Sequence, residues 1–336
     1  MNIINKCTSV ICFSIIICFA GSCKSQQSFG ASYLQLNKVI AMPGIKGRID
    51  HMDINLKAGL LYVAALGNNT LEVVDINSGR VLHSINGLDE PQGVAYIPGQ
   101  DEIFVANGGN GECYFFNAKT YERTGVIKLS SDADDVRYDA AERKIYVGYG
   151  DGGIAIINAA THLQTGDVKL MGHPESFQID KKENKLYVNV PDDNMIVVID
   201  LGTLKVMSEW KRNTLSANFP LAMDTASHLI FIGYRHPAKL QVLSAMDNEM
   251  ALLDMAGDAD DLYYDEKTAE IFVSGGSGYI NMFRRDNSGA YKQIANIPTR
   301  NGARTSLLVP ALNLFILAGR AGSGSDASVW IYKVTP

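Results

Sequence analysis

Two short acidic motifs contain the densest groups of carboxylates in the chain. Asp132–Ala133–Asp134–Asp135 and Asp258–Ala259–Asp260–Asp261 share one pattern and begin 126 residues apart. Carboxylate oxygens are the ligands that Ca²⁺ prefers, about six to eight of them per ion. The motifs therefore predict a site for Ca²⁺ or another divalent cation, or a recess for a polyhydroxylated ligand. The candidate metal ligands are Asp134, Asp135, Asp260 and Asp261.

The alternative for these carboxylates is structural. Their spacing matches no dedicated metal-binding loop, so they can instead accept backbone N–H groups at the starts of strands.

Glu175, in His173–Pro174–Glu175–Ser176, is the first candidate for a general base, and His51 is the second. A base needs a pKa near the working pH, which burial and a neighbouring cation such as Arg304 or His51 can set. The structural alternatives are an ion pair between repeats for Glu175 and a hydrogen-bonded histidine for His51. No catalytic residue is assigned from this pattern alone.

Arg235, in Tyr234–Arg235–His236–Pro237, has the side chain best suited to hold an anion. Its planar guanidinium can clamp a carboxylate or phosphate through two hydrogen bonds. The alternative is an exposed loop charge. Sequence motifs for haem attachment (Cys-x-x-Cys-His), zinc proteases (His-Glu-x-x-His), the serine-hydrolase elbow and phosphate-binding loops are missing from the chain.

A recurrent apolar triplet identifies the elements that must position these residues. Successive copies begin 42, 42, 41, 44, 41 and 43 residues apart. The copies are Leu61–Tyr62–Val63, Ile103–Phe104–Val105, Ile145–Tyr146–Val147, Leu186–Tyr187–Val188, Ile230–Phe231–Ile232, Ile271–Phe272–Val273 and Leu314–Phe315–Ile316. This period is typical of β-propellers, with one four-stranded blade per repeat. We therefore predict an all-β fold, a single seven-bladed propeller.

Strands within the first repeat follow from short apolar runs between turn residues. We expect strands over Ile49–Ile54, Leu60–Ala65, Leu71–Asp75 and Val81–Ile85. The last repeat ends after the strand Ser328–Val334 and lacks a fourth strand. Leu34–Met42, which precedes the first repeat, should supply it and close the ring.

In this strand order, the loops leading into each innermost strand lie on the same face as the loops joining the second and third strands. We call this the top face. Eleven residues before each triplet lie Asp50, Gln92, Asp134, Glu175, Phe219, Asp260 and Ala303, and ten before lie His51, Gly93, Asp135, Ser176, Pro220, Asp261 and Arg304. We expect them to line an acidic channel mouth. The candidate ligand-binding residues are Arg48, Asp50, His51, Asp135, His173, Glu175, Asn218, Arg235, Asp261 and Arg304.

The N-terminal segment predicts export. Residues 1–22 combine a short basic start, an apolar run too short to span a membrane comfortably, and small residues before Cys23. This is typical of a lipoprotein signal peptide, with Cys23 as the lipidated residue; a freely secreted protein or a retained membrane anchor are the alternatives. Residues 23–33 then form a flexible tether, and residues 34–336 the propeller. The expected location is extracytoplasmic, in the periplasm or at the outer membrane, with membrane contact through the lipid only.

Charge and cysteine content narrow the partners. The formal net charge of −6 disfavours nucleic acid, which requires a concentrated positive surface. Cys113 is the only cysteine after residue 23, so the propeller has no internal disulfide, and a buried thiol is expected there. We expect a monomer whose partner is a small molecule or an envelope protein.

The repeat core, Leu61–Tyr62–Val63–Ala64 followed by Gly67–Asn68–Asn69–Thr70–Leu71–Glu72–Val73–Val74–Asp75, resembles the YVTN-type repeat of bacterial propellers. From about residue 34 onward the chain resembles the YncE-like family of secreted seven-bladed propellers. That resemblance implies an extracytoplasmic propeller, and it extends to lactonase-type propellers, which hydrolyse lactones at the channel mouth.

These observations predict an exported, lipid-anchored propeller that binds a ligand or protein through its acidic channel mouth. The alternative function is that of a lactonase-like hydrolase, with Glu175 or His51 as the base and a divalent cation polarising the carbonyl. No other cofactor is predicted.

Overall fold

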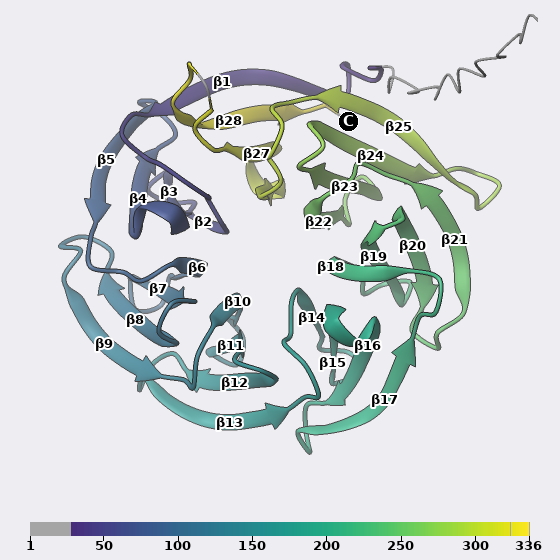
Figure 1. Ribbon diagram of the computed structural model, residues 1–336, viewed down its shortest axis with the longest axis horizontal. Coiled ribbons are helices and arrows are strands. Elements are labelled where there is room, and N and C mark those ends of the chain that lie inside the picture. Colours follow the sequence, from purple (N-terminus) through teal and green to yellow (C-terminus); the bar gives the residue numbers. More distant parts are fainter. Residues whose placement is uncertain (1–27, 323, 336) are drawn as a thin grey trace, which may run out of the picture.

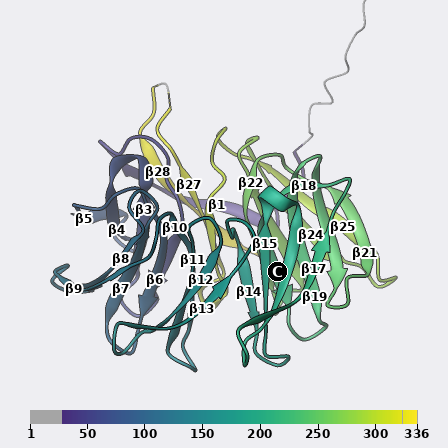
Figure 2. The ribbon, with the colours of Figure 1, turned by 60° about the horizontal axis from the view of Figure 1, so that its bottom comes forward.

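The computed structural model describes residues 28–322 and 324–335, which form seven four-stranded antiparallel sheets arranged as blades around a central axis (Figures 1 and 2). This confirms the predicted seven-bladed β-propeller. The predicted signal peptide, residues 1–22, and the predicted lipidation site, Cys23, lie outside the described residues. No helix long and apolar enough to cross a bilayer occurs within residues 28–322 and 324–335.

Each blade runs from its innermost strand at the channel to its outermost strand at the rim. Blades 1 to 4 comprise β2 (Met52–Asn55), β3 (Leu60–Ala65), β4 (Thr70–Asp75) and β5 (Arg80–Ile85); β6 (Pro91–Ile97), β7 (Glu102–Asn107), β8 (Glu112–Asn117) and β9 (Arg123–Lys128); β10 (Ala133–Asp139), β11 (Lys144–Tyr149), β12 (Gly153–Asn158) and β13 (Leu163–Lys169); β14 (Phe177–Asp180), β15 (Lys185–Val190), β16 (Met195–Asp200) and β17 (Lys205–Lys211).

Blades 5 to 7 comprise β18 (Ser216–Asp224), β19 (Leu229–His236), β20 (Ala238–Ser244) and β21 (Glu249–Asp254); β22 (Ala259–Asp265), β23 (Glu270–Gly275), β24 (Tyr279–Arg285) and β25 (Tyr291–Pro298); and β26 (Ser306–Val309), β27 (Leu314–Gly319), β28 (Ala327–Val334) and β1 (Leu34–Met42). Three short 3₁₀ helices are also present, namely η1 (Leu66–Asn68), η2 (Pro191–Asp193) and η3 (Pro310–Leu312).

The recurrent triplet explains how neighbouring blades adhere. Successive side chains of a strand point to opposite faces of its sheet. In blade 1, Leu61 and Val63 pack into the core shared with blade 7, while Tyr62 packs into the core shared with blade 2. The same alternation recurs in blades 2 to 6. Each triplet therefore contributes to two apolar cores and joins its blade to both neighbours.

The predicted triplet of the last blade was placed one residue too early. Leu317 and Phe315 pack against blade 6, whereas Ile316 packs against blade 1, so Phe315–Ile316–Leu317 is the equivalent triplet. The run Leu314–Phe315–Ile316–Leu317 fits the apolar pattern in both frames, and only the inter-blade packing distinguishes them. With this correction, Arg304 moves from ten to eleven residues before its triplet.

The N-terminal strand closes the ring. As predicted, Leu34–Met42 forms β1 and pairs antiparallel with β28, from Leu34 opposite Val334 to Met42 opposite Ala327. Ile40 and Met42 of β1 join the core between blades 7 and 1. The outermost strand of the last blade thus comes from the other end of the chain, which locks the ring without a disulfide (Figure 1). Cys113 is buried, as expected.

Strand pairing is irregular where the innermost strands of blades 2, 3, 5 and 6 begin. In blade 3, Ala133 pairs with Tyr149 and Val136 with Val147, so Asp134 and Asp135 together oppose the single residue Gly148. Such a bulge twists the strand and re-aims its side chains. In blade 1 the pairing is regular, but the strand begins at Met52 rather than at the predicted Ile49. In blade 3 the bulge delivers two successive side chains, those of Asp134 and Asp135, to the channel.

Residues 28–33, the part of the predicted tether within the described residues, lie against blade 6. Phe29 exchanges two backbone hydrogen bonds with Asn296 of β25, at N···O distances of 3.2 and 2.9 Å. The chain therefore joins the propeller at β25 before it enters β1.

Closure through β1 makes a testable prediction. Ile40 is 1% exposed and packs between blades 7 and 1, whereas its neighbour Val39 is 52% exposed on the opposite side of the strand. Ile40→Ala should lower the free energy of unfolding by about 2–5 kcal/mol through loss of apolar burial and a residual cavity. Val39→Ala, the matched control, should lower it by less than about 1 kcal/mol. Urea unfolding measures both, and equal losses would contradict a packed closure.

Candidate functional site

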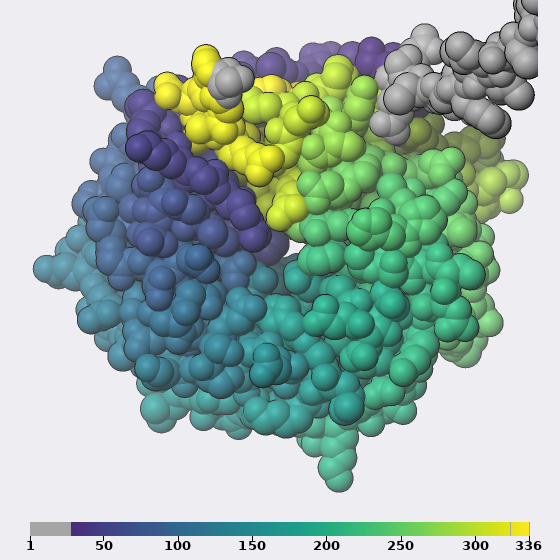
Figure 3. All heavy atoms as spheres, in the orientation of Figure 1, coloured from purple at the N-terminus to yellow at the C-terminus, as the bar shows by residue number. Residues whose placement is uncertain are grey.

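A cavity of about 540 Å³ opens at the centre of the top face (Figure 3). In the corrected frame, every blade contributes the residue eleven positions before its triplet, and all seven line this cavity. We call this set the inner ring; it consists of Asp50, Gln92, Asp134, Glu175, Phe219, Asp260 and Arg304. The sequence therefore predicts the location of the site, and the prediction improves once the last frame is corrected.

Two positions earlier in each leading loop lies a second set of residues, the outer ring. Four of its members also line the cavity: Arg48, Glu90, Asp132 and His173. Asp258 occupies the same position in blade 6. Leu66 reaches the cavity from the connection between the second and third strands of blade 1, and Arg235 from the end of β19, the second strand of blade 5, rather than from a loop.

The two arginines from blades 5 and 7 are neutralised within the site. Arg304 donates to Asp260 (Nε to Oδ2, 2.7 Å) and to Asp258 (Nη1 to Oδ1, 2.8 Å). Arg235 also bonds Asp260, and its guanidinium carbon lies 3.5 Å from the centroid of the Phe219 ring. Both arginines are therefore committed to aspartates on this side of the mouth, and Arg304 forms no ion pair with Glu175 among the described residues, contrary to the expectation that it is a neighbouring cation.

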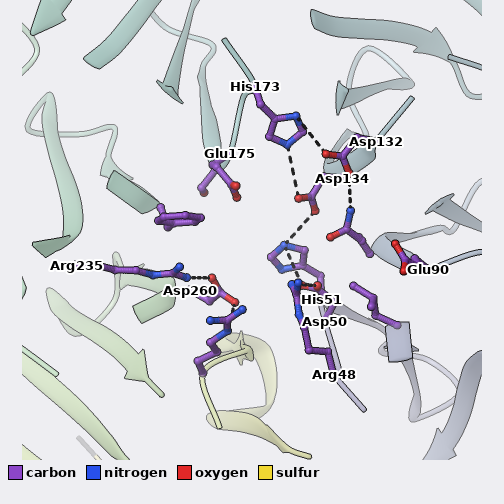
Figure 4. A pocket seen from close by; sticks show the side chains of 15 residues that line it. Arg48, Asp50, His51, Glu90, Asp132, Asp134, His173, Glu175, Arg235 and Asp260 are labelled. Carbon is purple, nitrogen blue, oxygen red and sulfur yellow. Dashed lines mark hydrogen bonds and ion pairs between the residues drawn. The ribbon is translucent and has the colours of Figure 1, made fainter. Parts of the chain in front are cut away.

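His51 lies in the channel among three carboxylates, of which Figure 4 shows Asp50 and Asp134. Its Nε2 lies 3.7 Å from Asp50 and 3.9 Å from Asp134, and its Nδ1 lies 3.6 Å from Asp261. The two acidic motifs therefore face each other across one imidazole. Burial lowers the pKa of His51, but the Asp261 and Asp50 carboxylates outweigh it and hold the pKa well above its usual value.

Opposite the arginines, blades 3 and 4 bring Asp134, His173 and Glu175 together (Figure 4). One potential ligand atom from each lies within 4.8 Å of the others. His173 Nδ1–H donates to the Gly150 carbonyl at 2.6 Å, and its Nε2 lies 3.9 Å from Asp134. Among the described residues, none hydrogen-bonds to or forms an ion pair with the Glu175 carboxylate. These are the side chains best placed to hold a metal ion.

Burial and neighbouring charges raise the pKa values of Glu175, His173 and the nearby Asp50. Burial, followed by the charges of Asp134 and Asp260, raises the pKa of Glu175 well above its usual range. Burial lowers the pKa of His173, but the Asp134 carboxylate and the Gly150 carbonyl raise it to about 9. Burial and the neighbouring Asp134 raise the pKa of Asp50 to about 7, against the opposing charge of His51. Asp50 and His173 are therefore at least partly protonated near neutral pH.

The remaining predicted ligands serve other purposes. Asp135 and Asp261 line a deeper cavity of about 300 Å³ below the mouth. Each accepts a backbone N–H of the next blade, from Phe177 at 3.4 Å and from Ser306 at 2.6 Å. Asp135 also pairs with Arg137. This is the strand-capping alternative for these two carboxylates.

Asn218 lies outside the mouth. It is fully buried, and its side-chain amide donates to Asn189 at 3.1 Å and to the Met195 carbonyl at 2.9 Å. Of the residues that had not been selected as candidates, Gln92 and Phe219 line the cavity, as do Glu90 and Asp132. The repeat frame contains the signal for all four, since they occupy inner-ring and outer-ring positions.

Comparison with known proteins identifies the fold and no more. No family model and no curated protein matches the chain. A chain in the crystal structure of a mitotic checkpoint complex superposes with a TM-score of 0.73 at 16% identity, covering 96% of this chain and 98% of the other. A chain of Kuenenia stuttgartiensis hydrazine synthase gives a TM-score of 0.73 at 14% identity, covering 86% and 98%. At such identities, the likeness establishes a β-propeller, which hosts many unrelated functions.

The raised pKa values predict an unusual dependence of stability on pH. Asp50 titrates near 3.8 when unfolded and near 7 when folded, mainly because of burial. Its protonation stabilises the fold fully below about pH 4, and this contribution is lost as the pH rises through 7. His173, raised to about 9, has the same sign, and its contribution is lost between about pH 6.5 and 9. The free energy of unfolding should therefore fall from pH 5 to pH 9.

Asp50→Asn should flatten this fall between about pH 5 and 7, by on the order of a few kcal/mol. Urea unfolding in chelator-treated buffer across this range measures it. The exposed Asp151→Asn is the matched control and should retain the slope of the original chain. A variant at Asp50 with an unchanged slope would show that this carboxyl is already ionised at pH 5.

Proposed function

We propose that this protein binds a small ligand rich in hydrogen-bond donors, such as a polyhydroxylated or ammonium-bearing molecule, in the cavity at the channel mouth. The observation that carries the proposal is the Glu175 carboxylate, which lines the cavity without a partner among the described residues. A carboxyl group held in such a place normally finds a hydrogen-bond donor. A ligand hydroxyl or ammonium group supplies one.

The charge balance of the mouth supports a donor-rich ligand over an anion. Arg235 and Arg304 are committed to Asp258 and Asp260. Arg48 donates to Asp50 at 2.7 Å. The oxygens left without a hydrogen-bond partner among the described residues, including those of Glu175 and Oδ1 of Asp134, are acceptors. The cavity volume of about 540 Å³ lies within the range of about 300–1,000 Å³ typical of small-molecule sites.

A lactonase-like hydrolase is the second candidate. It is favoured by the raised pKa of Glu175, because a carboxylate with a higher pKa is a stronger base toward water. In this function Glu175 would activate water against a lactone carbonyl in the same cavity. His51, the other candidate base, faces three carboxylates and is better suited to remain a cation.

The cellular setting is also part of the proposal. The leader and Cys23 support an exported lipoprotein of the periplasm or outer membrane, and the repeat core supports membership of the YncE-like family. In such a setting the propeller is held near the membrane through a lipid, and its ligand is a small molecule or a segment of an envelope protein. A monomer is proposed.

Glu175→Gln tests the ligand proposal. Inositol, glucose, spermidine and a gluconolactone serve as probes in thermal unfolding and calorimetric titration. At least one probe should raise the melting temperature of the original chain by a few degrees, and Glu175→Gln should abolish that shift. Glu142→Gln, an exposed carboxylate between β10 and β11 on the opposite face, is the matched control and should keep it.

Persistence of the shift in Glu175→Gln would contradict the proposed site. Steady consumption of the lactone by the original chain, lost in Glu175→Gln and kept in Glu142→Gln, would favour the hydrolase over the binding module.

Cys23→Ser tests the anchor. The original chain, expressed in a Gram-negative bacterium with a radiolabelled fatty acid, should incorporate label and sediment with membranes. Cys23→Ser should incorporate none and be released in soluble form, because the thiol is the attachment point. A labelled Cys23→Ser variant, or an unlabelled original chain, would contradict lipidation at this residue.

A further inference from the structure

The arrangement of Asp134, His173 and Glu175 suits a second kind of ligand, a metal ion, in addition to the organic ligand proposed above. Two carboxylates and one imidazole converge from adjacent blades at the wall of an open cavity. Convergence of acidic groups alone is common on protein surfaces. Three further features argue for a metal ion: the orientation of the histidine, a buried oxygen without a partner, and a third side chain that is not held by any described residue.

We propose that Asp134, His173 and Glu175 form a binding site for a divalent transition-metal ion of the zinc class.

The orientation of His173 is that of a metal ligand. Because a carbonyl oxygen can only accept, the 2.6 Å contact to Gly150 requires the proton of the neutral ring to be on Nδ1. Nε2 then carries the free lone pair, and this is the nitrogen 3.9 Å from Asp134 Oδ2. A backbone carbonyl that fixes the ring of a ligating histidine in this way is the usual outer-shell partner in metal sites.

Asp134 supplies an independent observation. The residue is only 9% exposed, and its Oδ1 is buried without a hydrogen-bond partner among the described residues. The nearest cationic group, His51 Nε2, lies 3.9 Å away, beyond hydrogen-bond distance. A buried carboxylate oxygen left unpaired is costly and calls for a missing partner. This oxygen lies on the His51 side of the carboxylate, whereas Oδ2 faces His173 Nε2 at 3.9 Å. A metal ion bound through both oxygens of Asp134 would supply the missing partner.

Glu175 can complete the site because its carboxylate has no hydrogen bond or ion pair with any described residue. Ligands of one zinc ion lie about 3.4 Å apart for bonds of about 2.1 Å. The three atoms here lie within 4.8 Å of one another, so their separations must shorten by up to about 1.4 Å. Rotation of the Glu175 side chain can provide this, since it forms no hydrogen bond or ion pair with any described residue.

The donor set selects the class of metal. Ca²⁺ takes about six to eight oxygen ligands, and Mg²⁺ also prefers oxygen. One imidazole with two carboxylates suits Zn²⁺ and its neighbours better. The carboxylates predicted as calcium ligands are divided instead: Asp260 pairs with arginines, while Asp135 and Asp261 cap strands. Only Asp134 of the predicted four belongs to the proposed site.

Three protein ligands leave a position open toward the cavity. In zinc sites of this kind, the open position takes water or a ligand oxygen. The proposed metal therefore lies where a donor-rich ligand would bind, but its own binding does not require that ligand. The two proposals can consequently fail separately.

The full chain, stripped with a chelator and dialysed, tests the metal site without any organic ligand. Titration with Zn²⁺ by calorimetry, with metal content measured by mass spectrometry, should give about one ion per chain. Each of three variants removes one metal ligand and should weaken Zn²⁺ binding at least about tenfold: Asp134→Asn, His173→Ala and Glu175→Gln. Glu142→Gln should bind like the original chain. Co²⁺ should give visible d–d absorption bands that His173→Ala alters.

Circular dichroism and melting temperatures of the apo variants establish that each is folded. Failure of the original chain to bind Zn²⁺, equal binding by all three folded variants, or a preference for Ca²⁺ over Zn²⁺ would each overturn the proposal. If Zn²⁺ does not bind but Glu175→Gln still abolishes the shift produced by an organic probe, the ligand-binding function stands without the metal. If Zn²⁺ binds and no probe does, the metal site stands alone.

Discussion

Closure of the ring by β1 is the constraint on which the rest of the molecule depends. Blade 7 receives three strands from the C-terminal end of the chain and its fourth from residues 34–42. An open array would expose strand edges at both ends. Closure also brings blade 7 against blade 1, where the buried Thr305 hydroxyl donates to the Ile49 carbonyl at 3.3 Å. Arg304 and Asp50, which flank this contact, can line one cavity only because the ring is closed.

The closed ring creates an electrostatic problem at its centre, and the two halves of the mouth resolve it differently. On the side of blades 5 to 7, Arg235 and Arg304 neutralise Asp258 and Asp260. On the side of blades 3 and 4, Asp134 lies 3.9 Å from both His51 and His173, and no described residue forms an ion pair with Glu175. Buried carboxylates without close cations hold protons more tightly, as the raised pKa of Glu175 reflects. Binding of a cation or a hydrogen-bond donor would stabilise the carboxylates of Asp134 and Glu175, and for this reason we propose the ligand and metal sites on this side of the mouth.

The fold was predictable because the repeat determines it. A triplet that serves two cores must recur at the blade period, and the β1 strand was correctly bounded at Leu34–Met42. The last frame was misplaced because Leu314–Phe315–Ile316–Leu317 fits the pattern twice. The ring of mouth residues was also predictable from the repeat. The trio was not, because sequence spacing does not reveal that His173 of the outer ring approaches Asp134 of the neighbouring blade.

The two acidic motifs, residues 132–135 and 258–261, have the same sequence, but their carboxylates have different neighbours. A bulge sends Asp134 to the mouth and Asp135 to the deeper cavity, and the same division separates Asp260 from Asp261. The second carboxylate of each motif caps the next blade, which explains their shared pattern. The first carboxylates differ in their neighbours: Asp260 meets two arginines, whereas Asp134 meets two histidines at 3.9 Å. Guanidinium groups satisfy a carboxylate through short hydrogen bonds, while imidazoles held at this distance leave its oxygen available. The repeat therefore supplies equivalent carboxylates at Asp134 and Asp260. Their different neighbours explain why Asp260 forms ion pairs with arginines, whereas Asp134 is the one we propose as a metal ligand.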